Sequence, residues 1–290
     1  MCGSGFKIVK TSVVIAVFNH SEILRKSLLC ASGQADYIDE IVISDDGSSE
    51  DVLQVIKDAA PQLNCATTYV RQQDLGFRLA RSKNNGIRHS TGDYLIFIDQ
   101  DLIYTKGYIK TFIGHRRKRQ FIVSYPIRLD EKTSVAITND AIRKGRFDQY
   151  LSFNQKKVVY RQFIKDGWEH GLRTIVGNSK HKPKLRGGCF AANREDLLSV
   201  NGFDENFIGW GNEDDDLGRR FYCSGIIGKN YFWNEFPLHL YHPEYHQGGE
   251  RNNHAYSAER IEAAKYGDLR AVYGVENTLG DDTVEVIKIQ

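Results

Sequence analysis

The sequence predicts an α/β fold in which a mostly parallel central sheet carries helices on both faces. Residues 12–18 are a continuous apolar run rich in β-branched side chains, which is typical of a strand buried on both faces. Strand and helix patterns then alternate at short intervals to about residue 99. The strands end in polar residues, and in such sheets ligands bind beyond the carboxyl ends of the strands.

The first half of the chain provides the repeating elements of this fold. The expected strands are residues 12–18, 39–44, 65–71 and 93–99. The expected helices are residues 21–32, 50–59 and 78–89. No Gly-x-Gly-x-x-Gly follows the first strand, and no Gly-x-x-x-x-Gly-Lys-Ser/Thr occurs. A dinucleotide-binding fold and a phosphate-binding P-loop are therefore disfavoured.

The alternation stops after a strand at residues 121–125. Residues 128–184 are rich in basic and aromatic side chains and suggest an insertion, with a plausible helix at 148–163. Its aromatic residues could cover a substrate, although a small packed helical lobe is favoured. Strand character resumes at 185–193, followed by a helix at 194–200, a strand at 236–241 and a helix at 252–266. Residues 278–290 could form a short strand or a tail.

Composition limits the function classes. The 290 residues carry a net charge of +2, and a nucleic-acid-binding protein would usually be far more basic. The five cysteines are scattered without a Cys-x-x-Cys pair, so a zinc ribbon or disulfide framework is not indicated. No signal-peptide pattern or membrane-spanning apolar run occurs, which favours the cytoplasm. The basic run 115–119 is interpreted as a solvated helix end, with a peripheral membrane contact as the alternative.

Polar side chains follow three of the first four strands. Asn19 follows the first, Asp46 the second, and Asp99 and Asp101 the fourth. In an extended backbone, Asp99 and Asp101 point the same way. One carboxylate could hold a divalent cation that bridges a nucleotide diphosphate, while the other binds a ribose hydroxyl. Taken alone, this Asp-x-Asp is more often a pair of turn acids, but the buried strand before it favours a site at the sheet edge.

Basic residues lie near the start of the helix expected at 78–89. A helix N-terminus and basic side chains both favour phosphate. Arg78, which follows Gly76 and Phe77, is the better candidate for a phosphate ligand. Arg81 and Lys83 are interpreted as solvated helix charges.

The stretch Gly-Trp-Gly-Asn-Glu-Asp-Asp-Asp at 209–216 combines an aromatic ring with consecutive acids. The acids could simply stabilise a helix N-terminus. The flanking glycines allow a sharp turn that presents Trp210 outward. A ring that stacks on a sugar, beside carboxylates that accept hydroxyl protons, suits a carbohydrate site.

Together these motifs resemble those of a known enzyme family. The segments at 14–20, 44–48 and 99–101 look like the nucleotide-binding half of family 2 glycosyltransferases, which have the GT-A (Rossmann-like) fold. Gly-Phe-Arg-Leu at 76–79, Gly187-Gly188 and the stretch at 209–215 look like the C-terminal part shared with β-1,4-galactosyltransferases and bacterial chondroitin polymerases. The resemblance covers roughly residues 12–246.

The resemblance implies roles for particular residues. Asp214 matches the catalytic base, and Asp101 with His242 matches the Mn²⁺ (or Mg²⁺) ligands. The implied donor-nucleotide residues are Phe18, Asn19, Asp46, Arg78 and Asp99. The implied substrate-binding residues are Gly188, Trp210, Glu213 and Asp215. Taken alone, His242 would be interpreted as a polar group at a strand end.

Two positions depart from the family pattern, and two histidines find no counterpart in it. Asn212 stands where the galactosyltransferases have glycine, and Ala16 where many family 2 enzymes have proline. His239 and His246 are interpreted as surface residues.

The implied domain organisation is a GT-A domain over residues 1–250. It comprises a nucleotide-binding half at about 10–127, an insertion at about 128–184 and an acceptor half at about 185–250, and a C-terminal helix and tail cover 251–290.

The implied function is metal-dependent, inverting transfer of a hexose or N-acetylhexosamine from a UDP-sugar to a glycan or lipid-linked glycan hydroxyl. The setting would be bacterial surface polysaccharide synthesis, in the cytoplasm or at the inner face of the membrane. The alternatives are a sugar-nucleotide nucleotidyltransferase, disfavoured because no basic Gly-rich loop follows the first strand, and a non-catalytic sugar-binding module.

Overall fold

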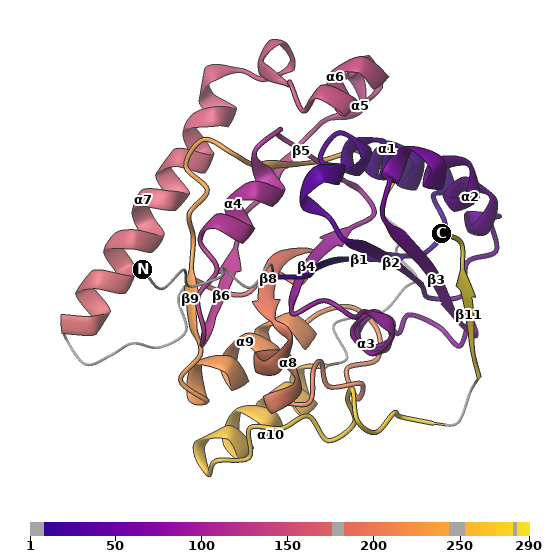
Figure 1. Cartoon of the computed structure of the whole chain (residues 1–290). Helices are drawn as coiled ribbons and strands as arrows, with labels where there is room; N and C mark the ends of the chain where they lie inside the picture. The colour runs from indigo at the N-terminus through magenta and orange to yellow at the C-terminus, as the bar shows by residue number, and fades with distance from the viewer. Residues whose placement is uncertain (1–8, 176–182, 244–252, 281–282) are drawn as a thin grey trace, which may run out of the picture.

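The computed structural model describes residues 9–175, 183–243, 253–280 and 283–290, and Figure 1 shows the elements in chain order. The strands are β1 (Thr11–Val17), β2 (Glu40–Asp45), β3 (Ala66–Gln72), β4 (Tyr94–Asp99), β5 (Leu102–Tyr104), β6 (Gln120–Val123), β7 (Ile127–Arg128), β8 (Cys189–Asn193), β9 (Ile227–Lys229), β10 (Pro237–His239) and β11 (Val284–Lys288). The α-helices are α1 (Ser21–Ser32), α2 (Val52–Leu63), α3 (Leu79–His89), α4 (Tyr108–Gly114), α5 (Glu131–Ala136), α6 (Asn139–Lys144), α7 (Phe153–Ile175), α8 (Arg194–Ser199), α9 (Glu213–Cys223) and α10 (His254–Lys265). Short 3₁₀ turns are η1 (Ala35–Tyr37) and η2 (Asp148–Tyr150).

A mostly parallel sheet forms the centre of the molecule. Among the described residues, eight strands are ordered β11-β3-β2-β1-β4-β8-β6-β9. Strands β3, β2, β1 and β4 run parallel, whereas β8 is antiparallel to both β4 and β6. The prediction of a mostly parallel sheet is confirmed. Because β2, β1 and β4 are parallel neighbours, their carboxyl ends lie at one edge.

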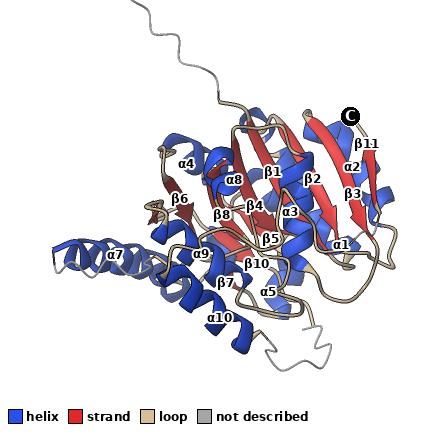
Figure 2. Cartoon of the chain, turned by 90° about the horizontal axis from the view of Figure 1, so that it is seen from below, coloured by secondary structure: helices blue, strands red, loops and turns tan. Residues whose placement is uncertain are grey.

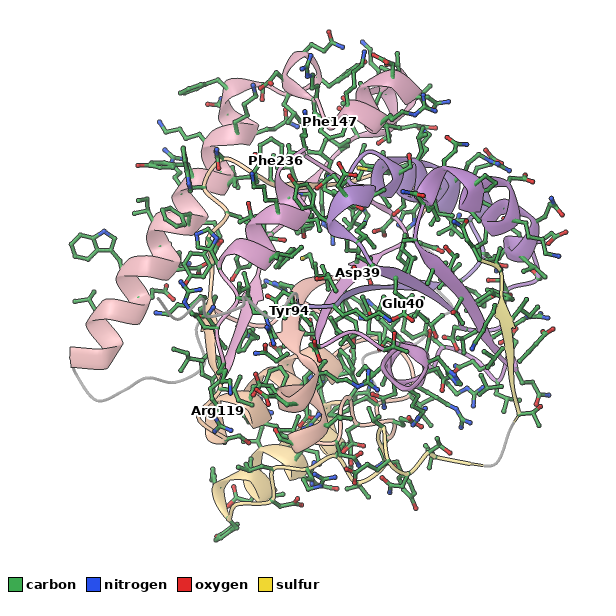
Figure 3. The ribbon with its side chains drawn as sticks, in the orientation of Figure 1. Asp39, Glu40, Tyr94, Arg119, Phe147 and Phe236 are labelled. Carbon is green, nitrogen blue, oxygen red and sulfur yellow. The ribbon has the colours of Figure 1, made fainter. Side chains whose placement is uncertain are left out.

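Helices cover both faces of this sheet (Figures 1 and 2). Side chains of β1 alternate between two buried clusters, as a strand requires. Val13 and Ile15 pack with residues of α1 and α2, and Val14 packs with residues of α3, α8 and α9. Phe147 and Phe236, labelled in Figure 3, extend the α1-side cluster toward the inserted segment. Burial on both faces explains why β1 has no polar alternation.

A second, smaller sheet places part of the C-terminal half of the chain beside the carboxyl end of β4. Within the described residues its order is β5-β10-β7. Strand β10 pairs antiparallel with β5, so that His239 lies opposite Leu102. The Leu240 backbone N–H also donates to the Asp101 carbonyl at 2.9 Å. The backbone therefore holds residues 239–242 beside Asp101.

The insertion is helical, but its helix differs from the one expected at 148–163. A 3₁₀ turn, η2, comes first, and α7 begins at Phe153 and extends to Ile175. Ser152 Oγ accepts a hydrogen bond from the Gln155 N–H at 3.3 Å, which caps a new helix at this point. None of the described helices combines the length and apolar character needed to cross a membrane.

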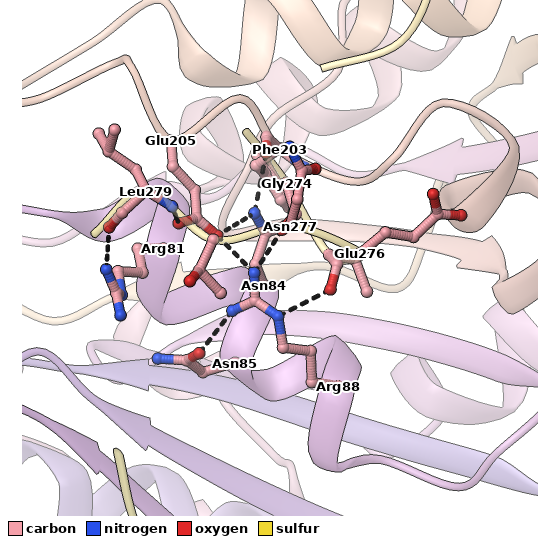
Figure 4. A network of polar contacts seen from close by, with 12 residues as sticks. Arg81, Asn84, Asn85, Arg88, Phe203, Glu205, Gly274, Glu276, Asn277 and Leu279 are labelled. Carbon is pink, nitrogen blue, oxygen red and sulfur yellow. Dashed lines mark hydrogen bonds and ion pairs between the residues drawn. The ribbon is translucent and has the colours of Figure 1, made fainter. Parts of the chain in front are cut away.

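The last residues, for which a strand or a tail was expected, form β11, which pairs antiparallel with β3. The segment before β11 binds to α3 through a buried polar network (Figure 4). Arg88 Nε donates to the Val275 carbonyl at 2.9 Å, and Arg81 donates to the Leu279 carbonyl. The interpretation of Arg81 as a solvated charge is therefore wrong, because the C-terminal segment covers its helix face.

Candidate active site

Three side chains that can bind a metal converge at the carboxyl edge of β4. Asp101 follows β4, His239 ends β10, and His242 follows three residues later. Nε2 of each histidine lies 3.1 Å from Asp101 Oδ2. The rings of His239 and His242 have centroids 5.3 Å apart, and the His20 ring lies 5.2 Å from that of His242. One carboxylate and two imidazoles thus face a common point.

The chemistry of this cluster fits a divalent ion. Asp101 Oδ1 is buried and has no hydrogen-bond partner among the described residues. Burial acts to raise the pKa of Asp101, but hydrogen bonds from His239 and His242 outweigh it and hold the pKa well below its usual range. The carboxylate is therefore ionised, as a ligand must be. Carboxylate oxygen and imidazole nitrogen are both common protein ligands of divalent metal ions.

His239 was interpreted as a surface residue, and this is wrong. Its side chain is largely buried against Asp101. The sequence contained a usable signal, because His239 and His242 form a His-x-x-His pair at the end of a strand. The missing information was the pairing of β10 with β5, which is a long-range contact. His246 lies outside the described residues.

Asp99 meets a buried lysine at the end of β4. Its side chain is 39% exposed, and its Oδ1 lies 3.9 Å from Nζ of Lys83, which is 2% exposed. Lys83 also lies over the Phe203 ring, 5.5 Å from the centroid. The interpretation of Lys83 as a solvated charge is therefore wrong. Helix α3 packs on the sheet and is also covered by residues near Phe203 and by the C-terminal segment, so even its polar residues are buried.

Gly187 and Gly188 allow the two acidic groups of the site to approach each other. A Cβ at Gly188 would lie 1.8 Å from Asp99 Oδ2, and one at Gly187 would lie 2.7 Å from Lys83 Nζ and 3.3 Å from the Asp214 Cβ. A glycine in or beside a strand often marks close backbone approach to a ligand. The structure shows a close approach to the side chains of the site itself.

Replacing Gly188 by alanine is expected to disturb the site without unfolding the protein. The new Cβ would displace the Asp99 carboxylate, whose end can swing aside. A misplacement of a reacting group by about 1 Å can cost about 10²-fold in kcat/KM. Steady-state kinetics and a thermal melt check the effect. Gly167→Ala is the matched control, because nothing described lies within 4 Å of its new Cβ. Unchanged kinetics in Gly188→Ala would contradict this role.

Helix α9 begins with the four predicted acids, which occupy different environments. Glu213 and Asp216 are buried, and Asp214 and Asp215 are half-buried. Asp216 pairs with Arg220 one turn further along the same helix at 2.7 Å, which is a structural role. Asp215 pairs with Lys184 at 3.1 Å. Only part of the acidic run is thus available for chemistry.

The Asp214 carboxylate is held by two backbone groups. Its Oδ2 accepts from the Gly187 N–H at 3.3 Å, and its Oδ1 accepts from the Asp215 N–H at 2.7 Å. Burial and repulsion from Asp214 raise the pKa of Glu213 to about 7, and the Lys83 ammonium opposes this shift. Glu213 is therefore partly protonated at neutral pH, and its protonated form can donate a hydrogen bond.

Replacing Lys83 by methionine should shift the pH dependence of activity. Burial raises the pKa of Asp99 and the Lys83 ammonium opposes this rise, so loss of the ammonium raises that pKa further. We expect the acidic limb of the pH–rate profile to move to higher pH, with reduced activity at pH 7. Lys110→Met, at an exposed position, is the control. A profile that matches the wild type would show that Lys83 only fills space.

Trp210 lies on a fixed and exposed turn. Gly209 and Gly211 have φ of 83° and 94°, a region that suits glycine. The Gly209 N–H donates to the Phe77 carbonyl, and Asn253 Nδ2 donates to the Gly211 carbonyl, each at 2.9 Å. The Trp210 side chain is 63% exposed, as a stacking platform requires. Asn212 has φ of 77°, a region that suits glycine and that asparagine tolerates better than most residues.

The predicted nucleotide residues line the same edge, but several are already engaged by the protein. Asp46 is buried, and its carboxylate accepts hydrogen bonds from Gln72 Nε2 and, at 2.8 Å, from the Arg78 N–H. Burial raises the pKa of Asp46 to about 7. Asn19 Oδ1 accepts from the Ser49 N–H at 2.9 Å.

The two remaining predicted residues also have protein partners. Backbone groups of Phe18 bond to the Gln100 side chain. Arg78 Nη2 donates to the Gln73 carbonyl at 2.5 Å. Through these contacts Phe18 and Arg78 are held in place at the carboxyl edge of the central sheet.

Several curated proteins are similar to this chain. It is 28% identical over 230 residues to the chondroitin synthase of Pasteurella multocida, covering 76% of this chain and 24% of that protein. It is 27% identical over 250 residues to the chondroitin synthase of Escherichia coli, covering 80% of this chain and 34% of that protein. The chain thus spans about a quarter and a third of the length of these relatives.

Solved structures share the fold. The glucosyl-3-phosphoglycerate synthase from Mycobacterium tuberculosis in complex with Mn²⁺, UDP-glucose and phosphoglyceric acid gives a TM-score of 0.51 at 16% identity, covering 88% of this chain and 80% of that one. A mannosyltransferase from Pyrobaculum calidifontis in complex with GDP-Man and Mn²⁺ gives a TM-score of 0.53 at 15% identity, covering 82% of this chain and 58% of that one. These likenesses confirm the predicted GT-A fold.

Two family models match consecutive parts of the chain. The N-terminal domain of galactosyltransferase matches residues 176–243, which include α9, β10 and His242. Glycosyl transferase family 2 matches residues 12–173, more than half of the chain. The matches favour a glycosyltransferase over the nucleotidyltransferase and the non-catalytic module. The chain belongs to glycosyl transferase family 2 and is a glycosyltransferase with a GT-A fold.

Proposed function

We propose that the chain is a metal-dependent, inverting glycosyltransferase that moves a hexose or N-acetylhexosamine from a UDP-sugar to a hydroxyl of a glycan or lipid-linked glycan. The observation that supports this most is the convergence of two groups at one sheet edge. Asp101, His239 and His242 form a cluster that could hold a metal ion, and the α9 carboxylates approach Asp99 across Gly187 and Gly188. A metal-bound diphosphate and an acceptor hydroxyl would meet between these groups.

The donor half follows from the residues at the ends of β1, β2 and β4. Asp101, His239 and His242 would hold Mn²⁺ (or Mg²⁺), which when bound neutralises charge on the leaving diphosphate. Asp99, held near Lys83, would bind the nucleotide sugar. Arg78 would contact phosphate, and Phe18, Asn19 and Asp46 would form the wall of the nucleoside pocket.

The acceptor half follows from α9 and the turn before it. Asp214 would take the proton from the acceptor hydroxyl as its oxygen attacks the anomeric carbon. Attack from the face opposite the leaving UDP inverts the configuration. Protonated Glu213 would donate to a sugar oxygen, Trp210 would stack on a ring, and Asp215 with Lys184 would border the acceptor. Gly188 would leave room for the sugar beside Asp99.

The similar chondroitin synthases support a role in polysaccharide synthesis. We extend this to bacterial surface glycans, assembled in the cytoplasm or at the inner face of the membrane. The identity of one or two side chains can decide between hexoses and N-acetylhexosamines. We therefore propose only a class of donor and a class of acceptor, joined by a single type of glycosidic linkage.

The configuration of the product tests the reaction type. The enzyme is incubated with Mn²⁺, a UDP-sugar and glycan acceptors, and the new anomeric proton is observed by NMR. The donors are α-linked, so inversion predicts a β-linked product. An α-linked product would contradict the base role of Asp214. Release of pyrophosphate in a parallel incubation with UTP and a sugar 1-phosphate would instead indicate nucleotidyl transfer.

A further inference from the structure

The outer side of α7 carries a row of exposed apolar residues. Phe153, Tyr160, Ile164, Trp168 and Leu172 recur at helical spacing, and all are exposed. Phe153 is 77% and Trp168 67% exposed. An apolar row of this kind on a single helix face is uncommon on a protein that has only water around it. We call these five residues the α7 apolar row.

Basic residues lie within the same face. Lys157, Arg161 and Lys165 are exposed and fall between members of the α7 apolar row in helical register. Lys157 Nζ lies 5.9 Å from the centroid of the Phe153 ring, which places both on one side of the helix. We call these three residues the α7 basic row.

Of the two acidic residues of α7, one faces the protein interior and the other pairs with a single member of the α7 basic row. Asp166 is buried on the opposite side, where it accepts from Asn230 Nδ2 at 2.8 Å. Glu169 is largely buried and lies 3.8 Å from Lys165. Val159 is buried on the inner side as well. The inner side thus anchors the helix to the protein, and the outer side is both apolar and positively charged.

The position of α7 makes this face accessible. In Figures 1 and 2 the helix lies at one end of the molecule, and its C-terminal part extends beyond the central sheet. The face is therefore free to lie on a flat surface while the metal cluster remains in the body of the protein.

We propose that the outer side of α7 docks the enzyme on an anionic lipid surface. Aromatic and aliphatic side chains enter the boundary between headgroups and acyl chains, where tryptophan is favoured. Lysine and arginine extend from the same face to lipid phosphates. The charge selects a lipid surface over an uncharged apolar partner. The basic run 115–119, the alternative membrane contact considered from sequence, lacks an apolar row.

Vesicle sedimentation of the full chain tests this proposal without any substrate. Vesicles of equal parts phosphatidylglycerol and phosphatidylcholine should bind the protein, and vesicles of phosphatidylcholine alone should bind it weakly. Each basic residue contributes about fivefold, so Lys157→Gln with Arg161→Gln should weaken binding about 25-fold. Ile164→Gln with Trp168→Gln should weaken it at least about tenfold.

Matched variants elsewhere separate this face from general surface effects. Arg117→Gln with Lys118→Gln removes two exposed charges from the basic run, and Trp233→Gln removes an exposed tryptophan. Both should bind vesicles like the wild type. All variants should keep the same metal-dependent UDP release in solution.

Three results would overturn the proposal. The first is equal binding to both vesicle types, and the second is full binding by both α7 variants. The third is concentration-dependent self-association that the α7 variants abolish, without vesicle binding, which would identify the face as an interface between copies of the chain. Because binding is measured without donor, failure here leaves the proposed reaction untouched.

Discussion

Replacing Asp214 by asparagine is expected to abolish transfer while UDP still binds. The amide cannot take the acceptor proton, and loss of a general base typically costs about 10²–10⁴-fold in kcat. The Asp215 N–H can still donate to an amide oxygen in the Oδ1 position, and only the longer hydrogen bond from the Gly187 N–H to Oδ2 is lost, so the loop should keep its shape. Steady-state kinetics and calorimetric titration with UDP and Mn²⁺ measure the two effects separately.

The neighbouring acid provides the control. Asp215→Asn changes the next residue of the same helix, where the carboxylate pairs with Lys184 near the surface. Exposed pairs contribute little, so stability should change by less than about 1 kcal/mol. We expect a higher acceptor KM with most of kcat retained. Near-full turnover in Asp214→Asn, or equal loss of kcat in both variants, would contradict the assignment of the base.

The second large effect is expected at His239. If His239 is the third metal ligand, His239→Ala leaves Asp101 and His242 to hold the ion alone. Even outer-shell changes weaken metal binding by about 10–100-fold, and loss of a direct ligand should reach at least the upper end of this range. Activity should recover partly at high Mn²⁺. Titration of Mn²⁺ against UDP release gives the apparent affinity.

A histidine outside the cluster makes this result specific. His115 is exposed and stacks on Tyr231, with ring centroids 4.2 Å apart. His115→Ala should leave the Mn²⁺ dependence unchanged, whereas His242→Ala should weaken it like His239→Ala. If His239→Ala keeps the wild-type Mn²⁺ dependence, His239 only orients Asp101 and the sequence interpretation of a two-residue site stands.

The parallel half of the fold could be predicted because its signals are local. β1, with all seven residues buried, was visible as a run of β-branched residues, and α1 was predicted with the bounds that the structure shows. Polar residues at strand ends then indicated one edge, because parallel neighbours end together. The candidate residues Asp99, Asp101 and Asp214 follow from this pattern and from the family resemblance.

The remaining features depend on contacts between distant segments. Lys83 looked like a surface charge because α3 is polar, but the C-terminal segment and residues 203–205 cover that helix. His239 looked like a surface residue because its partner strand β5 is only three residues long and lies far away in sequence. Spacing along the chain does not encode such pairings.

UDP release from a panel of UDP-sugars tests the central claim most directly, with Mn²⁺ and then with EDTA, in the wild type and in Asp101→Asn. We predict release from one preferred donor, loss of this release in EDTA, recovery when Mn²⁺ is added back, and very low release in Asp101→Asn at all Mn²⁺ concentrations. Release that continues in EDTA, or that survives in Asp101→Asn, would contradict a metal-dependent site at this sheet edge.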